Sequence, residues 1–128
     1  MLNVPGRVLV FTHSDNSYKH GVLKRGGAEI IMMGEEEFLA GVLRYLAERE
    51  QVNEVLVEAG STLTGALLQD GLIDELILYQ APIIMGDSAR GLFHLPQLQN
   101  MQDRIELKLL ESRRIGNDMR LRLAVRNQ

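Results

Sequence analysis

The chain has 128 residues, 45% of them hydrophobic and 24% charged, with a net charge of −3. This suits one folded domain and argues against nucleic acid or an anionic membrane as the main partner, since both select a basic face. The absence of cysteine excludes disulfides and thiolate metal ligands, and no apolar run approaches the roughly 20 residues of a membrane span, so we expect a cytoplasmic protein.

The chain begins with a strand–helix–strand pattern. Residues 7–12 (RVLVFT) predict a buried strand, and residues 18–25 predict a short helix that Gly26 and Gly27 end. Residues 28–33 (AEIIMM) predict a second strand. Two strands joined through a helix favour a parallel pair with a right-handed crossover.

Residues 35–48 predict the clearest helix of the chain. Its apolar residues recur at three- and four-residue spacing on one face, namely Phe38, Leu39, Val42, Leu43 and Leu46. Glu35, Glu36 and Glu37 would occupy its first turn, where the helix dipole favours negative charge. A metal-binding acidic cluster is the alternative interpretation of these three residues.

The second half of the chain ends in strands. The expected elements are a third strand at 54–58, a helix at 63–69 before Gly71, a long strand at 74–85, and a hairpin of strands 104–114 and 119–126. Together with the first half they predict an α/β fold. Its sheet would be mixed and mainly parallel, flanked by helices, with a C-terminal antiparallel hairpin.

The residue types that suit ligand chemistry follow the third strand. Gly60, Ser61 and Thr62 stand where the strand turns into a helix, and the first turn of a helix presents unpaired amides and a positive dipole end. Gly60 would let the backbone approach a ligand, and Gly65 would let another segment pack closely on the helix. This pattern favours a phosphate or pyrophosphate site, and Ser61 and Thr62 can either donate to a phosphate oxygen or cap the helix. An ordinary capped helix begins in the same way.

Glu58 ends the third strand, where side chains of open α/β sheets point into the ligand crevice. Hydrogen bonding of its carboxylate to nearby loop amides is the alternative. The three histidines, His13, His20 and His94, show no paired spacing, so we expect exposed or loop histidines and no metal site.

The order of several short motifs resembles the reductase domain of the bacterial bifunctional riboflavin-biosynthesis deaminase/reductase family. In sequence they are a hydrophobic strand, E-x-G-x-x-L at 58–63, G-L-x-D-E-L at 71–76 and A-P-x-x-x-G at 81–86, followed by the turn at 115–118. The resemblance runs from about Arg7 to the C-terminus and is densest over 55–93. The combined pattern is specific, whereas none of its parts is.

The resemblance implies a dihydrofolate-reductase-like fold and the NADPH-dependent reduction of 5-amino-6-(5-phosphoribosylamino)uracil to its ribitylamino product. It implies substrate contact by Glu58, in orientation and not as an acid or base, and no catalytic residue is assigned. It implies that the cofactor phosphates lie along Gly60, Ser61, Thr62, Leu63, Thr64, Gly65 and Ala66.

Compared with the family, the chain is expected to be a single truncated reductase domain, which lacks the leading strands and the zinc-deaminase half. An exposed sheet edge would then favour a homodimer. Two alternatives stay open, namely another oxidoreductase of the dihydrofolate-reductase-like group and a non-catalytic remnant that serves in dimer contacts.

Overall fold

The computed structural model describes residues 6–126. These form two compact units, and the boundary along the chain lies between Val55 and Leu56. Each unit has a sheet of its own, and the two are described separately below. In the described part of the chain, no helix has the length and apolar character needed to cross a membrane.

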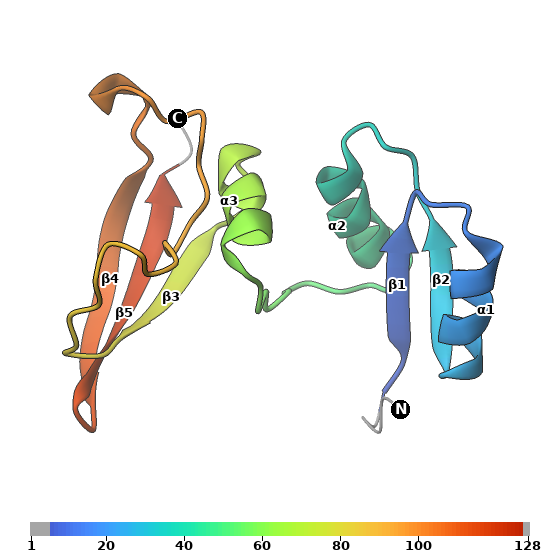
Figure 1. Ribbon diagram of the computed structural model, residues 1–128, viewed down its shortest axis with the longest axis horizontal. Coiled ribbons are helices and arrows are strands. Elements are labelled where there is room, and N and C mark those ends of the chain that lie inside the picture. The colour runs from blue at the N-terminus through green and yellow to red at the C-terminus, as the bar shows by residue number, and fades with distance from the viewer. Residues whose placement is uncertain (1–5, 127–128) are drawn as a thin grey trace. The chain divides into compact units, whose positions relative to one another are not determined.

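The first unit is built on two parallel strands. β1 (Val8–Thr12) pairs with β2 (Ala28–Met32) in a continuous register from Val8↔Ala28 to Thr12↔Met32. The helix α1 (Ser17–Arg25) connects them and lies alongside β2 (Figure 1). The predicted strand–helix–strand pattern and its parallel pairing are therefore confirmed.

The helix α2 (Phe38–Glu48) follows β2 and contacts β1 through aromatic residues. The rings of Phe11 and Tyr45 meet edge to face with their centroids 5.4 Å apart. The predicted start at residue 35 was wrong, because Glu37 adopts a left-handed backbone with φ of 49° and the helix begins only after it. The acidic residues 35–37 thus precede the first turn instead of filling it.

Residues 54–58, predicted as a strand, have no regular secondary structure. Val55, Leu56 and Val57 are exposed, although their apolar character suits a buried strand. A strand is defined by ladder hydrogen bonds to a neighbour, and nothing in the described part of the chain supplies them here. Among the described residues, the parallel component of the fold is consequently one strand pair, β1 with β2, which is less than predicted.

The second unit combines the helix α3 with a three-stranded antiparallel sheet. α3 is Ser61–Gln69, and the strands are β3 (Glu75–Gln80), β4 (Glu106–Ile115) and β5 (Asp118–Arg126), with a short 3-10 helix, η1 (Met101–Asp103), before β4. The strand order is β3–β5–β4, which places the last strand in the middle (Figure 1). The predicted hairpin is confirmed as β4 and β5, and its tight turn includes Gly116 at φ of 61°.

The register places leucines together on one face of this sheet. Leu76 faces Leu123, and Leu78 faces Leu121 on the same side. A bulge between Leu109 and Glu111 shifts the later part of β4 by one residue. Leu67 and Leu68 of α3 and Leu76 of β3 are buried, so the core of this unit combines the helix with the sheet.

β3 is shorter than the predicted strand at 74–85. Its last pair is Gln80 with Met119, next to the residue where β5 begins, and beyond it Pro82 has no amide to donate. The residues that follow, Ile83 to Met85, are exposed. The chain then runs as an irregular loop to η1.

Candidate functional site

The helix α3 begins directly after Gly60 and has no side-chain cap. Gly60 is its N-cap residue, with extended backbone angles (φ −76°, ψ 170°), and its carbonyl accepts the amide of Thr64 at 3.1 Å. A glycine cannot offer the side-chain oxygen that usually satisfies a first-turn amide. The amides of Ser61, Thr62 and Leu63 therefore precede the intrahelical hydrogen bonds, at the positive end of the helix dipole.

Sequence reasoning started this helix at Leu63 and allowed Ser61 or Thr62 to be its cap. The structure starts it two residues earlier, so both residues lie inside the first turn and neither caps it. The capping interpretation of these hydroxyls is wrong, and their interpretation as phosphate donors stays a prediction. An added Cβ at Gly60 would meet no atom within 4 Å, so the space beside this turn is open.

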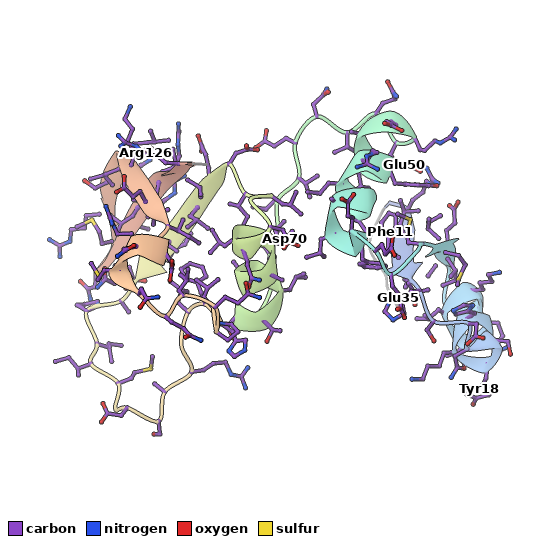
Figure 2. All side chains as sticks on the ribbon, turned by 90° about the horizontal axis from the view of Figure 1, so that it is seen from above. Phe11, Tyr18, Glu35, Glu50, Asp70 and Arg126 are labelled. Atoms are coloured by element: carbon purple, nitrogen blue, oxygen red, sulfur yellow. The ribbon has the colours of Figure 1, made fainter. Side chains whose placement is uncertain are left out.

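The opposite end of α3 is closed by hydrogen bonds. Gly71 has a left-handed backbone (φ 66°), its amide donates to the Leu68 carbonyl at 3.2 Å, and the Leu72 amide donates to the Leu67 carbonyl at 2.9 Å. This pair of bonds is a Schellman motif, in which glycine avoids the steric cost of positive φ. The prediction that Gly71 stops the helix is confirmed. Figure 2 labels Asp70, the C-cap residue before it.

The residues predicted to bind the cofactor differ in how far they reach the surface. Gly60, Thr62 and Leu63 are exposed, and Ser61, Thr64 and Ala66 are half-buried. Gly65 is buried. The surface that a ligand could contact is thus the beginning of α3, with the rest of the segment facing the protein.

Gly65 is covered by the loop that connects β3 to η1. A Cβ at this position would lie 2.9 Å from the carbonyl carbon of His94, 3.1 Å from its nitrogen and nearer still to its oxygen. The His94 amide also donates to the Ser61 carbonyl at 3.0 Å. The predicted close packing on Gly65 is confirmed, and the segment that packs there is the main chain at His94.

The contact of His94 with α3 was not predicted from the sequence, where this residue stood as a loop histidine. Its side chain is exposed, as expected, whereas its main chain is bound to the helix. The signal in the sequence was Gly65 itself, which predicted a close approach without naming the partner. A partner 29 residues away along the chain cannot be read from local spacing.

Glu58 lies two residues before Gly60 in the irregular segment, with an exposed side chain. Two residues span at most about 7 Å of chain, so its carboxylate remains near the start of α3. The alternative, a carboxylate bound to loop amides, finds no support among residues 6–126, where no such hydrogen bond is present.

The acidic residues before α2 contact side chains of their own unit. Glu35 Oε1 lies 3.8 Å from Nε2 of His13, and Glu37 Oε2 lies 3.9 Å from Nη2 of Arg44. Within residues 6–126 no three acidic or histidine side chains lie close enough together to share a metal ion. The alternative of a metal-binding cluster at 35–37 thus has no support in the structure.

Comparison with known proteins places this geometry in a known context. The model of the family described as "RibD C-terminal domain" matches residues 3–121. The chain is similar to the riboflavin biosynthesis protein RibD of Escherichia coli K12, with 49% identity over 82 residues, 64% of this chain and 22% of that protein. It is also similar to the 5-amino-6-(5-phosphoribosylamino)uracil reductase of Buchnera aphidicola from Acyrthosiphon pisum, with 41% identity over 83 residues, 65% of this chain and 40% of that protein.

A solved structure supports the same relationship. The Acinetobacter baumannii RibD structure, form 2, superimposes with a TM-score of 0.78 at 34% identity, over 93% of this chain and 31% of that chain. This likeness confirms the predicted dihydrofolate-reductase-like, mixed α/β fold. The chain spans between about a fifth and two fifths of the length of the relatives named here.

Proposed function

The chain belongs to the RibD C-terminal domain family, and on that premise we propose that it serves the NADPH-dependent reduction of 5-amino-6-(5-phosphoribosylamino)uracil in riboflavin biosynthesis. The reaction would convert the ribosyl group to ribityl: NADPH would supply a hydride to the sugar's C1, and a proton from solvent would complete the hydroxyl that is freed when the ring opens. The observation that carries the proposal is the open, uncapped first turn of α3 at Gly60, in a chain similar to a reductase of that name.

The proposed cofactor site is the start of α3. Phosphate oxygens would accept from the amides of Ser61, Thr62 and Leu63, and the open space at Gly60 fits a group that comes against the backbone. The hydroxyls of Ser61 and Thr62 add donors because neither caps the helix. Thr64, Gly65 and Ala66 would support this turn from the side that faces the protein.

Glu58 is proposed to orient the substrate. Its exposed carboxylate lies close along the chain to the cofactor turn, so a group that it holds would lie near the cofactor. A carboxylate accepts hydrogen bonds from sugar hydroxyls and from amino groups of a pyrimidine, and both occur in the proposed substrate. Hydride transfer depends mainly on this positioning, so we assign Glu58 no acid or base role.

Titration with NADPH tests the cofactor site. We expect amide chemical shifts to change at residues 60–63 and to stay unchanged in the β4–β5 hairpin. Absence of binding at millimolar NADPH would contradict the proposal.

Glu58→Gln tests the substrate role. The variant is expected to weaken binding of the aminouracil substrate about tenfold, on the order of 1.4 kcal/mol, because a charge-assisted hydrogen bond is lost. NADPH binding should be unchanged. Glu54→Gln is the matched control, since Glu54 is exposed in the same irregular segment. An equal loss in both variants would remove the special role of Glu58.

The proposal includes a homodimer in the cytoplasm. Within residues 6–126, β3 is an edge strand that pairs only with β5, and the apolar residues Ile83, Ile84 and Met85 after it are exposed. Unpaired edges and exposed apolar segments favour association. Sedimentation at equilibrium measures this directly, and a monomer at tens of micromolar protein would contradict it.

A further inference from the structure

The main chain of His94 holds α3 at two points. Its amide donates to the Ser61 carbonyl at 3.0 Å, and its carbonyl group occupies the space beside Gly65 that a side chain would need. Ser61 and Gly65 are four residues apart and therefore lie on the same face of the helix. The segment Phe93–Leu95, here called the strap, thus crosses this face at the turn that begins α3.

The rest of the loop has no comparable attachment to the helix. Residues 81–100 lack helix and strand, and the other main-chain hydrogen bonds of this stretch join residues two or three apart, as in Ala89 to Gly86 and Leu98 to Leu95. The bond from His94 to Ser61 is the long-range one. The first turn of α3 is thereby tied to the β3–β4 connection, in addition to its own neighbours along the chain.

We propose that the strap and Gly65 position the first turn of α3 for cofactor binding, so that Gly65 acts through His94 and not by touching the cofactor. This inference rests on the proposed function. Hydrogen bonds from amides to a phosphate lose strength when the donors are displaced or misaligned. A side chain at Gly65 would push the strap away and release the Ser61 carbonyl, which would loosen the turn that presents those amides.

Gly65→Ala tests this inference. We expect the dissociation constant for NADPH to rise at least tenfold and the His94 amide to lose its protection from hydrogen exchange. Affinity should be measured at a temperature where exchange of the β5 amides shows that the sheet is still formed, because a purely structural role would then leave the dissociation constant unchanged.

Gly91→Ala is the matched control, since it lies in the same loop and its added Cβ would be 3.6 Å from the Phe93 carbonyl oxygen, an ordinary contact. This variant should keep both the affinity for NADPH and the protection of the His94 amide.

A second variant decides the matter if Gly65→Ala fails to fold. His94→Pro removes the amide that binds the Ser61 carbonyl without adding a side chain at Gly65, and its ring Cδ, which replaces the amide hydrogen, also pushes the strap away from that carbonyl. It should weaken NADPH binding in the same direction while the β5 amides stay protected. Unchanged affinity in a folded strap variant would overturn the inference alone, whereas failure of the wild-type chain to bind NADPH would overturn the proposed function with it.

Discussion

Two helices of this chain have equal length and opposite beginnings. α1 and α3 each contain nine residues, but Asn16 caps α1, its side chain accepting from the Lys19 amide at 3.0 Å, whereas Gly60 leaves α3 without a side-chain cap. α1 buries no residue, while α3 buries Leu67 and Leu68. A helix whose side chains are buried can leave its first amides free for a ligand, whereas α1, which buries no residue, depends more on its cap.

The largest expected effect concerns the packing of α3. Leu67→Ala should lower the free energy of unfolding of residues 56–128 by about 2–5 kcal/mol, because it leaves a cavity at a side chain that is 5% exposed. Hydrogen exchange of the β5 amides measures this loss. Leu63→Ala is the control on the same helix, at 44% exposure, and should cost under about 1 kcal/mol. Equal costs would mean that packing does not hold α3.

The next largest effect is expected at Gly60, where a substitution should change helix stability and NADPH affinity in opposite directions. Gly60→Asp places a carboxylate at the N-cap, where the extended backbone suits it, and should raise helix stability by about 0.5 kcal/mol. The same carboxylate repels phosphate, so NADPH affinity should fall at least tenfold, roughly 1.4 kcal/mol. Gly60→Asn caps the helix without the charge and should lose less affinity. An unchanged NADPH affinity in Gly60→Asp would contradict the proposal that a cofactor phosphate binds at this turn.

The capped helix α1 should show the opposite pattern, a change in stability without a change in NADPH affinity. Asn16→Ala should lower the stability of residues 1–55 by about 1 kcal/mol, since one first-turn amide loses its acceptor. Thermal unfolding followed by circular dichroism measures the change, and Asn16→Asp, which keeps an acceptor, should retain most of the stability. NADPH affinity should not respond to either variant. A stable Asn16→Ala protein would show that α1 does not need its cap.

The smallest effect is expected at Ser61. Ser61→Ala should weaken NADPH binding by about 0.5–1 kcal/mol, the size of one hydroxyl hydrogen bond, with the unfolding free energy unchanged. Isothermal titration with NADPH detects a change of this size. If Ser61→Ala lowered the unfolding free energy but not the affinity for NADPH, the Ser61 hydroxyl would be a helix cap and not a phosphate donor.

The sequence predicted those features whose causes are local. The apolar period of α2, the glycine that ends α3 and the turn at 115–118 each act within a few residues, and the structure confirms all three. The predicted start of α3 was two residues too late, because serine and threonine beside a glycine are as typical of a cap as of a first turn.

Apart from the starts of α2 and α3, the errors concern partners that are distant along the chain. Residues 54–58 have the composition of a strand, but composition does not supply a neighbouring strand, and none pairs with them in the described part of the chain. Gly65 predicted a close contact, yet its partner His94 could be found only from the structure. The sequence therefore predicted the segment that forms the candidate site. It did not predict that the loop at His94 packs on that segment.

The order of strands in the second sheet has a consequence for biosynthesis. The central strand, β5, is the last of the three to be made, so neither β3 nor β4 has its partner until the ribosome has added residues 118–126. While β4 is being synthesised, β3 therefore remains unpaired. Unpaired strands of this kind are prone to aggregation, and chaperones protect them. Folding of this unit should thus begin late, with the β4–β5 hairpin, and end when β3 joins it.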